Sequence, residues 1–203
     1  MQQTIPCEHV PDTPEFRALS DIVGLAIDLR YATADNFVGR DLYSPLDCGW
    51  LHRDAATALE RSLAWLKVER PDVRMLVLDA LRPQRVQEEL WESLQGTDLL
   101  GYLAHPIRGS VHSFGMAVDI TLLDADGNEL DMGTGFDDMT ERSHPALEDA
   151  LCERGELSPA HIAHRRLLRA AMQDGGWRGI NSEWWHFDCG DRELIRAHYR
   201  RVL

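Results

Sequence analysis

The apolar segments of this chain are short and unevenly spaced, and this pattern constrains the fold more than any other feature. Segments 73–78 (VRMLVL) and 116–123 (MAVDITLL) have the length and apolar, β-branched content of buried strands. Apolar residues recur at helical spacing over 54–69, and further helices are expected over 84–94, 160–174 and 192–200. Strands and helices therefore occur in clusters, without a regular alternation of the two, which favours the α+β class.

We expect a single domain over residues 1–203, with a central, mostly antiparallel sheet flanked by helices. No internal repeat or linker rich in Pro, Gly and Ser divides the chain, and 203 residues are enough for one core. Residues 1–20 are expected to form an irregular N-terminal arm. Strands are also expected over 22–29 and 183–187, and a long loop over 31–43.

Charge and composition exclude several classes of protein. Asp and Glu total 34 against 21 for Lys and Arg, a net charge of −13, which argues against a nucleic-acid-binding protein. No apolar run approaches the ~20 residues needed to span a bilayer. The N-terminus lacks the basic region and apolar core of a signal peptide, and the four scattered cysteines are expected to be reduced. We therefore expect a cytoplasmic protein, whose oligomeric state the sequence does not indicate.

One candidate site lies in the segment 110–119. His112 stands in a turn-like stretch that ends at Gly115, and Asp119 lies in the strand that follows. A bend at Gly115 could bring both side chains to one point. A lone histidine is more often a hydrogen-bonded structural residue, but a carboxylate buried within an apolar strand needs a cation, a metal or hydrogen-bond donors.

A second candidate segment contains Glu183 and His186 with two tryptophans between them. Together, His112, Asp119 and His186 offer two nitrogens and one oxygen, the usual protein ligands of a catalytic zinc ion, with the fourth position left for water. Zinc lowers the pKa of such water to about 7. Glu183, beside a ligand and not needed as one, is then the natural general base. We expect this zinc site to lie in a cleft on the sheet.

Arg82 is a third candidate, because it lies in the segment DALRP (79–83) at the end of the expected strand 73–78. An arginine at the end of a strand can present a fixed charge to a site there and stabilise the oxyanion of a carbonyl hydrolysis. Arg82 could equally form a structural ion pair with Asp79, and the sequence does not decide between these two interpretations.

These segments together resemble the D-alanyl-D-alanine dipeptidases of the VanX type. This family belongs to a larger group of zinc peptidases that includes D,D-carboxypeptidases and the Hedgehog signalling domain. The SxHxxGxAxD motif of the group matches 110–119 at every defined position, and its ExxH element is EWWH at 183–186. Three further segments are similar to the dipeptidases: DLRYATADNFVG (28–39), DALRP (79–83) and MGTGFDDMTERSH (132–144). The resemblance spans roughly residues 20–190.

The resemblance implies one zinc ion per chain, a dipeptide substrate and a role for each motif residue. The implied zinc ligands are His112, Asp119 and His186, the implied base is Glu183, and Arg82 is the implied transition-state stabiliser. Asp137 is expected to bind the substrate's ammonium, although the adjacent Asp138 leaves that assignment open by one position. Ser110 and Tyr31 are expected to line the substrate cavity.

The activity implied by the resemblance is hydrolysis of free D-Ala-D-Ala to two D-alanines. The biological setting would be either cell-wall dipeptide recycling or resistance to glycopeptide antibiotics. A D,D-carboxypeptidase acting on longer peptidoglycan peptides is an alternative, which the missing export signal disfavours. A non-catalytic zinc-binding interaction module is another alternative, and the presence of Glu183 and Arg82 disfavours it.

Overall fold

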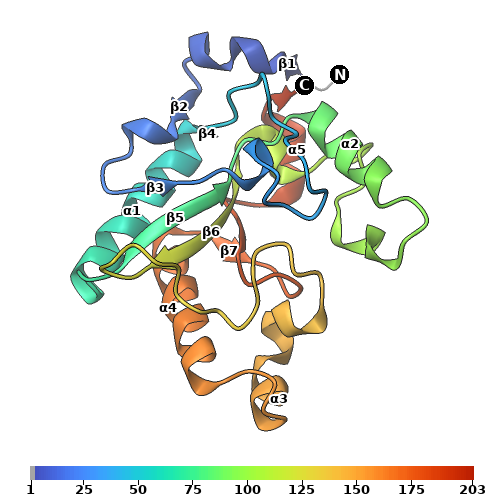
Figure 1. Ribbon diagram of the computed structural model, residues 1–203. Coiled ribbons are helices and arrows are strands. Elements are labelled where there is room, and N and C mark those ends of the chain that lie inside the picture. The colour runs from blue at the N-terminus through green and yellow to red at the C-terminus, as the bar shows by residue number, and fades with distance from the viewer. Residues whose placement is uncertain (1–2) are drawn as a thin grey trace.

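The computed structural model describes residues 3–203, and a five-stranded sheet lies at its centre (Figure 1). The strand order is β3 (Ala26–Ile27), β5 (Arg74–Asp79), β6 (Ala117–Leu123), β8 (His186–Asp188) and β7 (Arg178–Gly179). β3 is parallel to β5, and the remaining neighbours are antiparallel. The expected α+β class and the mostly antiparallel sheet are confirmed.

Two long helices cover one face of this sheet. The helices are α1 (Arg53–Glu69), α2 (Gln84–Ser93), α3 (Glu148–Glu153), α4 (Pro159–Gly175) and α5 (Arg192–His198). α1 and α4 pack against each other, α1 also against β5 and α4 against β6. Val118, Ile120 and Leu122 of β6 belong to the main core together with residues of both helices. Because side chains alternate along a strand, Asp119 projects from the opposite face.

The N-terminal arm is not irregular, contrary to our expectation for residues 1–20. β1 (Thr4–Ile5) pairs in parallel with β9 (Arg201–Val202), a 3₁₀ helix spans Cys7–Asp12, and β2 (Phe16–Ala18) pairs with β4 (Trp50–His52). Residues 1–2 lie outside the described part. Strands of two or three residues carry too little alternation to be predicted locally, and their stabilising partners are distant in the sequence.

Two of the expected strands are shorter than predicted. Within 22–29 only Ala26–Ile27 pairs with the sheet, since Gly24 adopts a positive φ of 87° and breaks the extended run. Within 183–187, β8 begins only at His186, so Glu183 belongs to the loop before the strand. Residues 31–43, all of which the structure describes, form the expected loop and contain no strand. A 3₁₀ helix, Arg30–Ala32, lies at the start of this loop.

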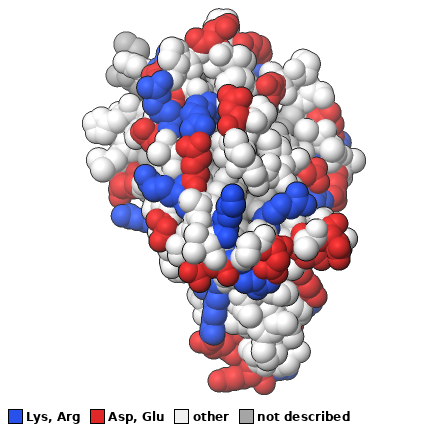
Figure 2. Space-filling view, turned by 90° about the vertical axis from the view of Figure 1, so that its left-hand side faces the viewer, with Lys and Arg blue, Asp and Glu red and all other residues white. Residues whose placement is uncertain are grey.

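The surface and the thiols complete the description of the chain. Over residues 3–203 no helix combines the length and the apolar character that crossing a bilayer requires. Acidic and basic side chains are interspersed over the side of the molecule seen in Figure 2. All four cysteines are free thiols in the structure.

Candidate active site

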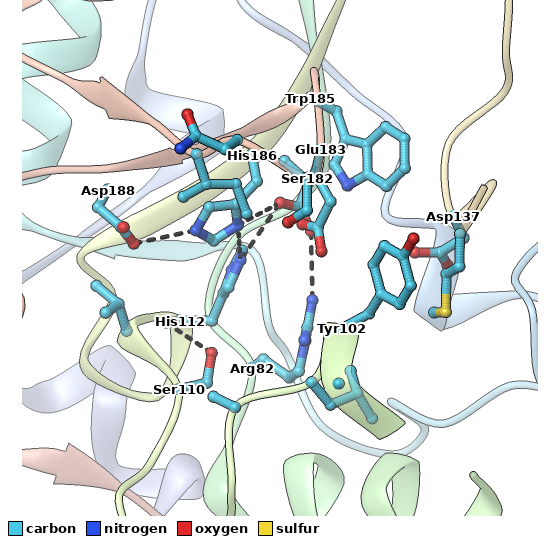
Figure 3. Close-up of a pocket in the computed structure, with 18 of the residues that line it drawn as sticks. Arg82, Tyr102, Ser110, His112, Asp137, Ser182, Glu183, Trp185, His186 and Asp188 are labelled. Carbon is cyan, nitrogen blue, oxygen red and sulfur yellow. Dashed lines mark hydrogen bonds and ion pairs between the residues drawn. The ribbon is translucent and has the colours of Figure 1, made fainter. Parts of the chain in front are cut away.

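A pocket of about 620 Å³ brings most of the candidate residues together. Its lining includes the following sequence-predicted residues: Tyr31, Arg82, Ser110, His112, Asp119, Asp137, Glu183 and His186. Asp119 reaches it from the face of the sheet opposite α1 and α4. The expected cleft on the sheet is therefore present, and it holds every site residue that the sequence suggested apart from the alternative Asp138. Figure 3 shows Arg82, Ser110, His112, Asp137, Glu183 and His186 around it.

The strand register explains why two of these residues meet. Asp119 of β6 lies directly opposite His186 of β8, and on its other side it lies opposite Asp79 of β5. Directly opposed residues on neighbouring strands have side chains only about 5 Å apart on the same face. Asp119 and His186 thus lie side by side in the pocket, with Asp79 on the other side of Asp119.

His112 reaches this row from a short 3₁₀ helix, Val111–Phe114. The Ser110 hydroxyl accepts a hydrogen bond from the backbone N–H of His112 at the start of this helix, and Gly115 ends it with φ 63°. Nδ1 of His112 donates to the carbonyl oxygen of Ala80 at 2.8 Å. Because a carbonyl only accepts, the proton of this hydrogen bond is on Nδ1, and Nε2 faces the pocket.

His186 is held in the same way by a carboxylate. Its Nε2 donates to Asp188 Oδ1 at 3.0 Å, and Nε and Nη2 of Arg192 contact Asp188 Oδ2 in turn. Nδ1 of His186 is therefore turned toward Asp119 Oδ1 at 2.9 Å. Burial opposes the charge on His186, but Asp188 and Asp119 raise its pKa well above the usual value.

His112, Asp119 and His186 form a donor set suited to a metal ion. His112 Nε2 lies 3.1 Å from His186 Nδ1 and 3.4 Å from Asp119 Oδ1, and all three ligand atoms lie within 4.8 Å of one another. Two ligands, each about 2 Å from a tetrahedral zinc ion, lie about 3.3 Å apart. The buried donor set therefore fits zinc in both spacing and ligand chemistry.

Arg82 forms the ion pair with Asp79 that the sequence suggested, and it also lines the pocket, so the ion pair leaves the second interpretation open. Its Nε and Nη2 donate to Asp79 Oδ2 at 2.9 and 2.6 Å, and Nη2 also reaches Asp119 Oδ2 at 3.3 Å. The guanidinium lies 4.9 Å from the centre of the Tyr31 ring. These contacts fix a buried positive charge beside Asp119.

Glu183 enters the pocket from the loop before β8. The neighbouring Trp184 is buried and donates to the Thr134 hydroxyl at 2.9 Å, while Trp185 packs edge-on against Phe136. The two indole rings thus anchor the loop that carries Glu183 to the segment 134–136. Burial raises the pKa of Glu183 to about 7.

Asp137 lines the pocket, whereas the alternative Asp138 does not. Tyr31, which is buried, donates to Asp137 Oδ1 at 3.2 Å, and Oδ2 is buried with no hydrogen-bond partner in the described chain. Asp137 is the one non-glycine residue with a positive φ, 61°, among residues 3–203. Burial and the charge of Asp119 raise its pKa to about 8. Asp138 accepts from the backbone N–H of Thr140 instead.

Sequence reasoning missed several other residues of the pocket. The Tyr102 hydroxyl hydrogen-bonds to His144 Nε2 at 2.8 Å and joins two wall segments. His144 ends the segment 132–144 that resembles the dipeptidases, whereas Tyr102 carries no local signal. Asp188 had a usable signal, because it lies two residues after His186 in a strand and so faces the same side. Arg108, Arg192 and Arg196 also line the pocket and carry no motif.

Comparisons with known proteins identify the family of this chain. The family model described as D-ala-D-ala dipeptidase, of peptidase family M15, matches residues 13–202. The chain is 42% identical to the D-alanyl-D-alanine dipeptidase of Escherichia coli (strain K12), over 87% of this chain and 86% of the relative. It is 31% identical to the enzyme of that name from Enterococcus faecium, over 91% and 96%. The chain therefore belongs to the D-ala-D-ala dipeptidase family of M15 peptidases.

Proposed function

We propose that this protein hydrolyses free D-Ala-D-Ala to two D-alanines, with one zinc ion held by His112, Asp119 and His186. The observation that carries the proposal is the meeting of this donor set with Glu183 and Arg82 in one pocket. The names of the relatives, all D-alanyl-D-alanine dipeptidases, support the choice of substrate.

Two imidazoles and one carboxylate leave one position of a tetrahedral zinc ion open, as a catalytic site requires. Zinc bound there supplies Lewis-acid polarisation of a carbonyl and lowers the pKa of water at the site to about 7. The contacts from Ala80 and Asp188 keep both imidazoles in the tautomer that this ligation needs.

Glu183 serves as the general base and then as the general acid. Its carboxylate accepts a proton from the attacking water and passes that proton to the amine of the departing D-alanine. A proton carrier works best with a pKa near the operating pH, and the raised pKa of Glu183, about 7, suits this role at neutral pH.

Arg82 stabilises the negative charge that develops on the carbonyl oxygen. Nε and Nη2 of Arg82 both donate to Asp79, which fixes the guanidinium before the substrate binds. Little reorganisation is therefore needed during the reaction. The lining position of Arg82 beside Asp119 supports this role, because the reacting carbonyl must lie next to the same ligand.

Asp137 binds the ammonium group of the substrate. A buried carboxylate oxygen without a partner is costly, and a bound ammonium would satisfy Oδ2 while Tyr31 holds Oδ1. The left-handed backbone at Asp137 supports this choice over Asp138, since such conformations persist where the surroundings require them. Ser110 and Tyr31 line the cavity around the substrate.

A pocket that binds the ammonium group directly explains how longer or blocked peptides are rejected. An acylated or extended N-terminus would have to displace the charge partner of Asp137 and leave that carboxylate unpaired. We infer a cytoplasmic setting, in which the dipeptide is either recycled from the cell wall or removed in glycopeptide resistance. Both settings use the same site.

The test is a parallel hydrolysis assay of the zinc-loaded protein on three peptides, with and without a chelator. The peptides are D-Ala-D-Ala, L-Ala-L-Ala and N-acetyl-D-Ala-D-Ala. We expect cleavage of the free D,D-dipeptide alone and loss of that activity when the metal is removed.

Three results would contradict the proposal. Equal cleavage of the acetylated peptide would mean that the pocket is open at the ammonium end, as in a D,D-carboxypeptidase. No cleavage by protein with one zinc ion bound would indicate a binding module. Activity that survives full metal removal would rule out the metal-dependent mechanism.

A further inference from the structure

The charged side chains of the pocket are divided between its two ends. Asp137 and Tyr102 lie on one side of the histidine pair, while Asp188 and Ser110 lie on the other (Figure 3). Apart from Arg82, the lining arginines belong to the second side: Arg192 binds Asp188, and Arg196 Nε donates to the carbonyl oxygen of Gly109, next to Ser110. In a chain with a net charge of −13, one end of this pocket is thus lined by arginines.

Two of these arginines already have partners. Arg192 Nε donates to Asp188 Oδ2 at 2.6 Å, and Arg196 Nη1 donates to Glu193 Oε1 at 2.9 Å. The guanidinium of Arg108 has no hydrogen-bond or ion-pair partner within residues 3–203, although it lines the pocket. Burial lowers the pKa of Arg196, and repulsion from Arg108 lowers it further. An anion bound between these side chains would relieve that repulsion.

Ser110 offers a second donor at the same end. Its oxygen accepts from the backbone N–H of His112, so its hydroxyl hydrogen remains available to a ligand. A hydroxyl and a guanidinium together suit a carboxylate, which accepts several hydrogen bonds at once.

We propose that Arg108 binds the C-terminal carboxylate of the dipeptide substrate, with Ser110 beside it. This inference rests on the proposed function. A dipeptide carries its ammonium and its carboxylate at opposite ends, with the scissile carbonyl between them. When the ammonium lies at Asp137 and the carbonyl at the histidine pair, the carboxylate extends toward Ser110 and Arg108, roughly one residue length of 3.6 Å further on. The pocket then recognises both termini, and its specificity for dipeptides follows.

The test compares two substrates and three variants by steady-state kinetics. The substrates are D-Ala-D-Ala and its C-terminal amide, which lacks the negative charge of the carboxylate and is similar to it in size. The variants are Arg108→Gln, Arg108→Lys and the control Arg178→Gln. Arg178 is exposed and lines a neighbouring pocket together with Arg108, but it does not line the pocket of the histidine pair.

We expect Arg108→Gln to lower kcat/KM for the free acid about 10-fold or more, mainly through KM, and to change the amide by less than about twofold. Arg108→Lys should recover part of the loss, and Arg178→Gln should match the wild type on both substrates. Zinc content and circular dichroism check that each variant is folded and loaded.

An equal loss on both substrates, or no loss on either, would overturn the role of Arg108 while leaving the proposed function intact. Zinc-loaded wild-type protein that cleaves neither substrate would instead overturn the proposed function, and this inference with it.

Discussion

Glu183 is the residue on which the proposed chemistry depends most directly. It lies in the pocket beside the donor set without being needed as a ligand, so its chemical role can be separated from metal binding. We expect Glu183→Gln to retain one zinc ion per chain and to lower kcat at least about 100-fold, the usual range for loss of a general base. Zinc analysis and kcat measured on the same sample check this. Unchanged turnover would mean that another group moves the proton.

Several site residues could be predicted from the sequence because each stands in a compact motif. His112, Asp119 and His186 converge as expected, and Glu183 and Arg82 line the same pocket. The residues that were missed reach the pocket only through tertiary folding. Tyr102 and His144 come from separate segments, and nothing in either segment indicates that their side chains meet.

At the scale of elements, the accuracy of prediction followed the strength of the local pattern. The strand β6 begins one residue later than expected and ends where expected, because a fully buried strand is marked by a continuous run of apolar residues. The helix α1 agrees equally well, because its apolar stripe recurs over 17 residues. β1, β2 and β3 have only two or three residues each, and pairing with distant strands decides their conformation.

Gly115 connects the 3₁₀ helix that carries His112 to β6. Its φ is 63°, and a Cβ there would lie 2.7 Å from the backbone nitrogen of His52, which itself donates to the Gly115 carbonyl oxygen at 2.8 Å. A side chain would therefore have to push β4 away from the segment that positions His112.

We expect Gly115→Ala to lower the free energy of unfolding by at least about 1 kcal/mol more than Gly24→Ala. Gly24 has a similar positive φ, 87°, with no atom within 4 Å of its Cβ position, so it isolates the cost of the backbone conformation, about 1–2 kcal/mol. Urea unfolding of both variants measures the difference. Equal losses of unfolding free energy in the two variants would show that the close approach to His52 does not affect stability.

At the scale of the whole molecule, the fold holds the site together from both chain ends. β1 pairs with β9 at the two ends of the described chain, and Arg201 of β9 donates to the carbonyl oxygen of Arg108 at 3.0 Å. β2 pairs with β4, whose His52 contacts Gly115. The arm and the C-terminal strand therefore support the segment 108–115, which carries Ser110 and His112.

This framework buries carboxyl groups in the pocket, so we expect the stability of the metal-free protein to depend on pH. Asp137 and Glu183 have pKa values of about 8 and about 7, both raised above the ordinary range by burial. Groups with a raised folded-state pKa bind protons on folding. Their stabilising contribution is present at low pH and is lost as the pH rises through the folded-state pKa.

We therefore expect the metal-free protein to become less stable to urea as the pH rises from about 5 to about 8, by up to about 1.4 kcal/mol per pH unit for each such group. The raised pKa of His186 acts in the same direction, whereas His52, whose pKa is lowered by burial, opposes it at the acidic end. Asp137→Asn should flatten the dependence, because asparagine tolerates the same left-handed backbone but cannot titrate. Asp138→Asn serves as the neighbouring control and should keep the wild-type slope. An identical slope in the Asp137→Asn variant would mean that this carboxyl is already ionised in the empty pocket. Other groups of the protein would then compensate its charge before the ammonium of the substrate binds.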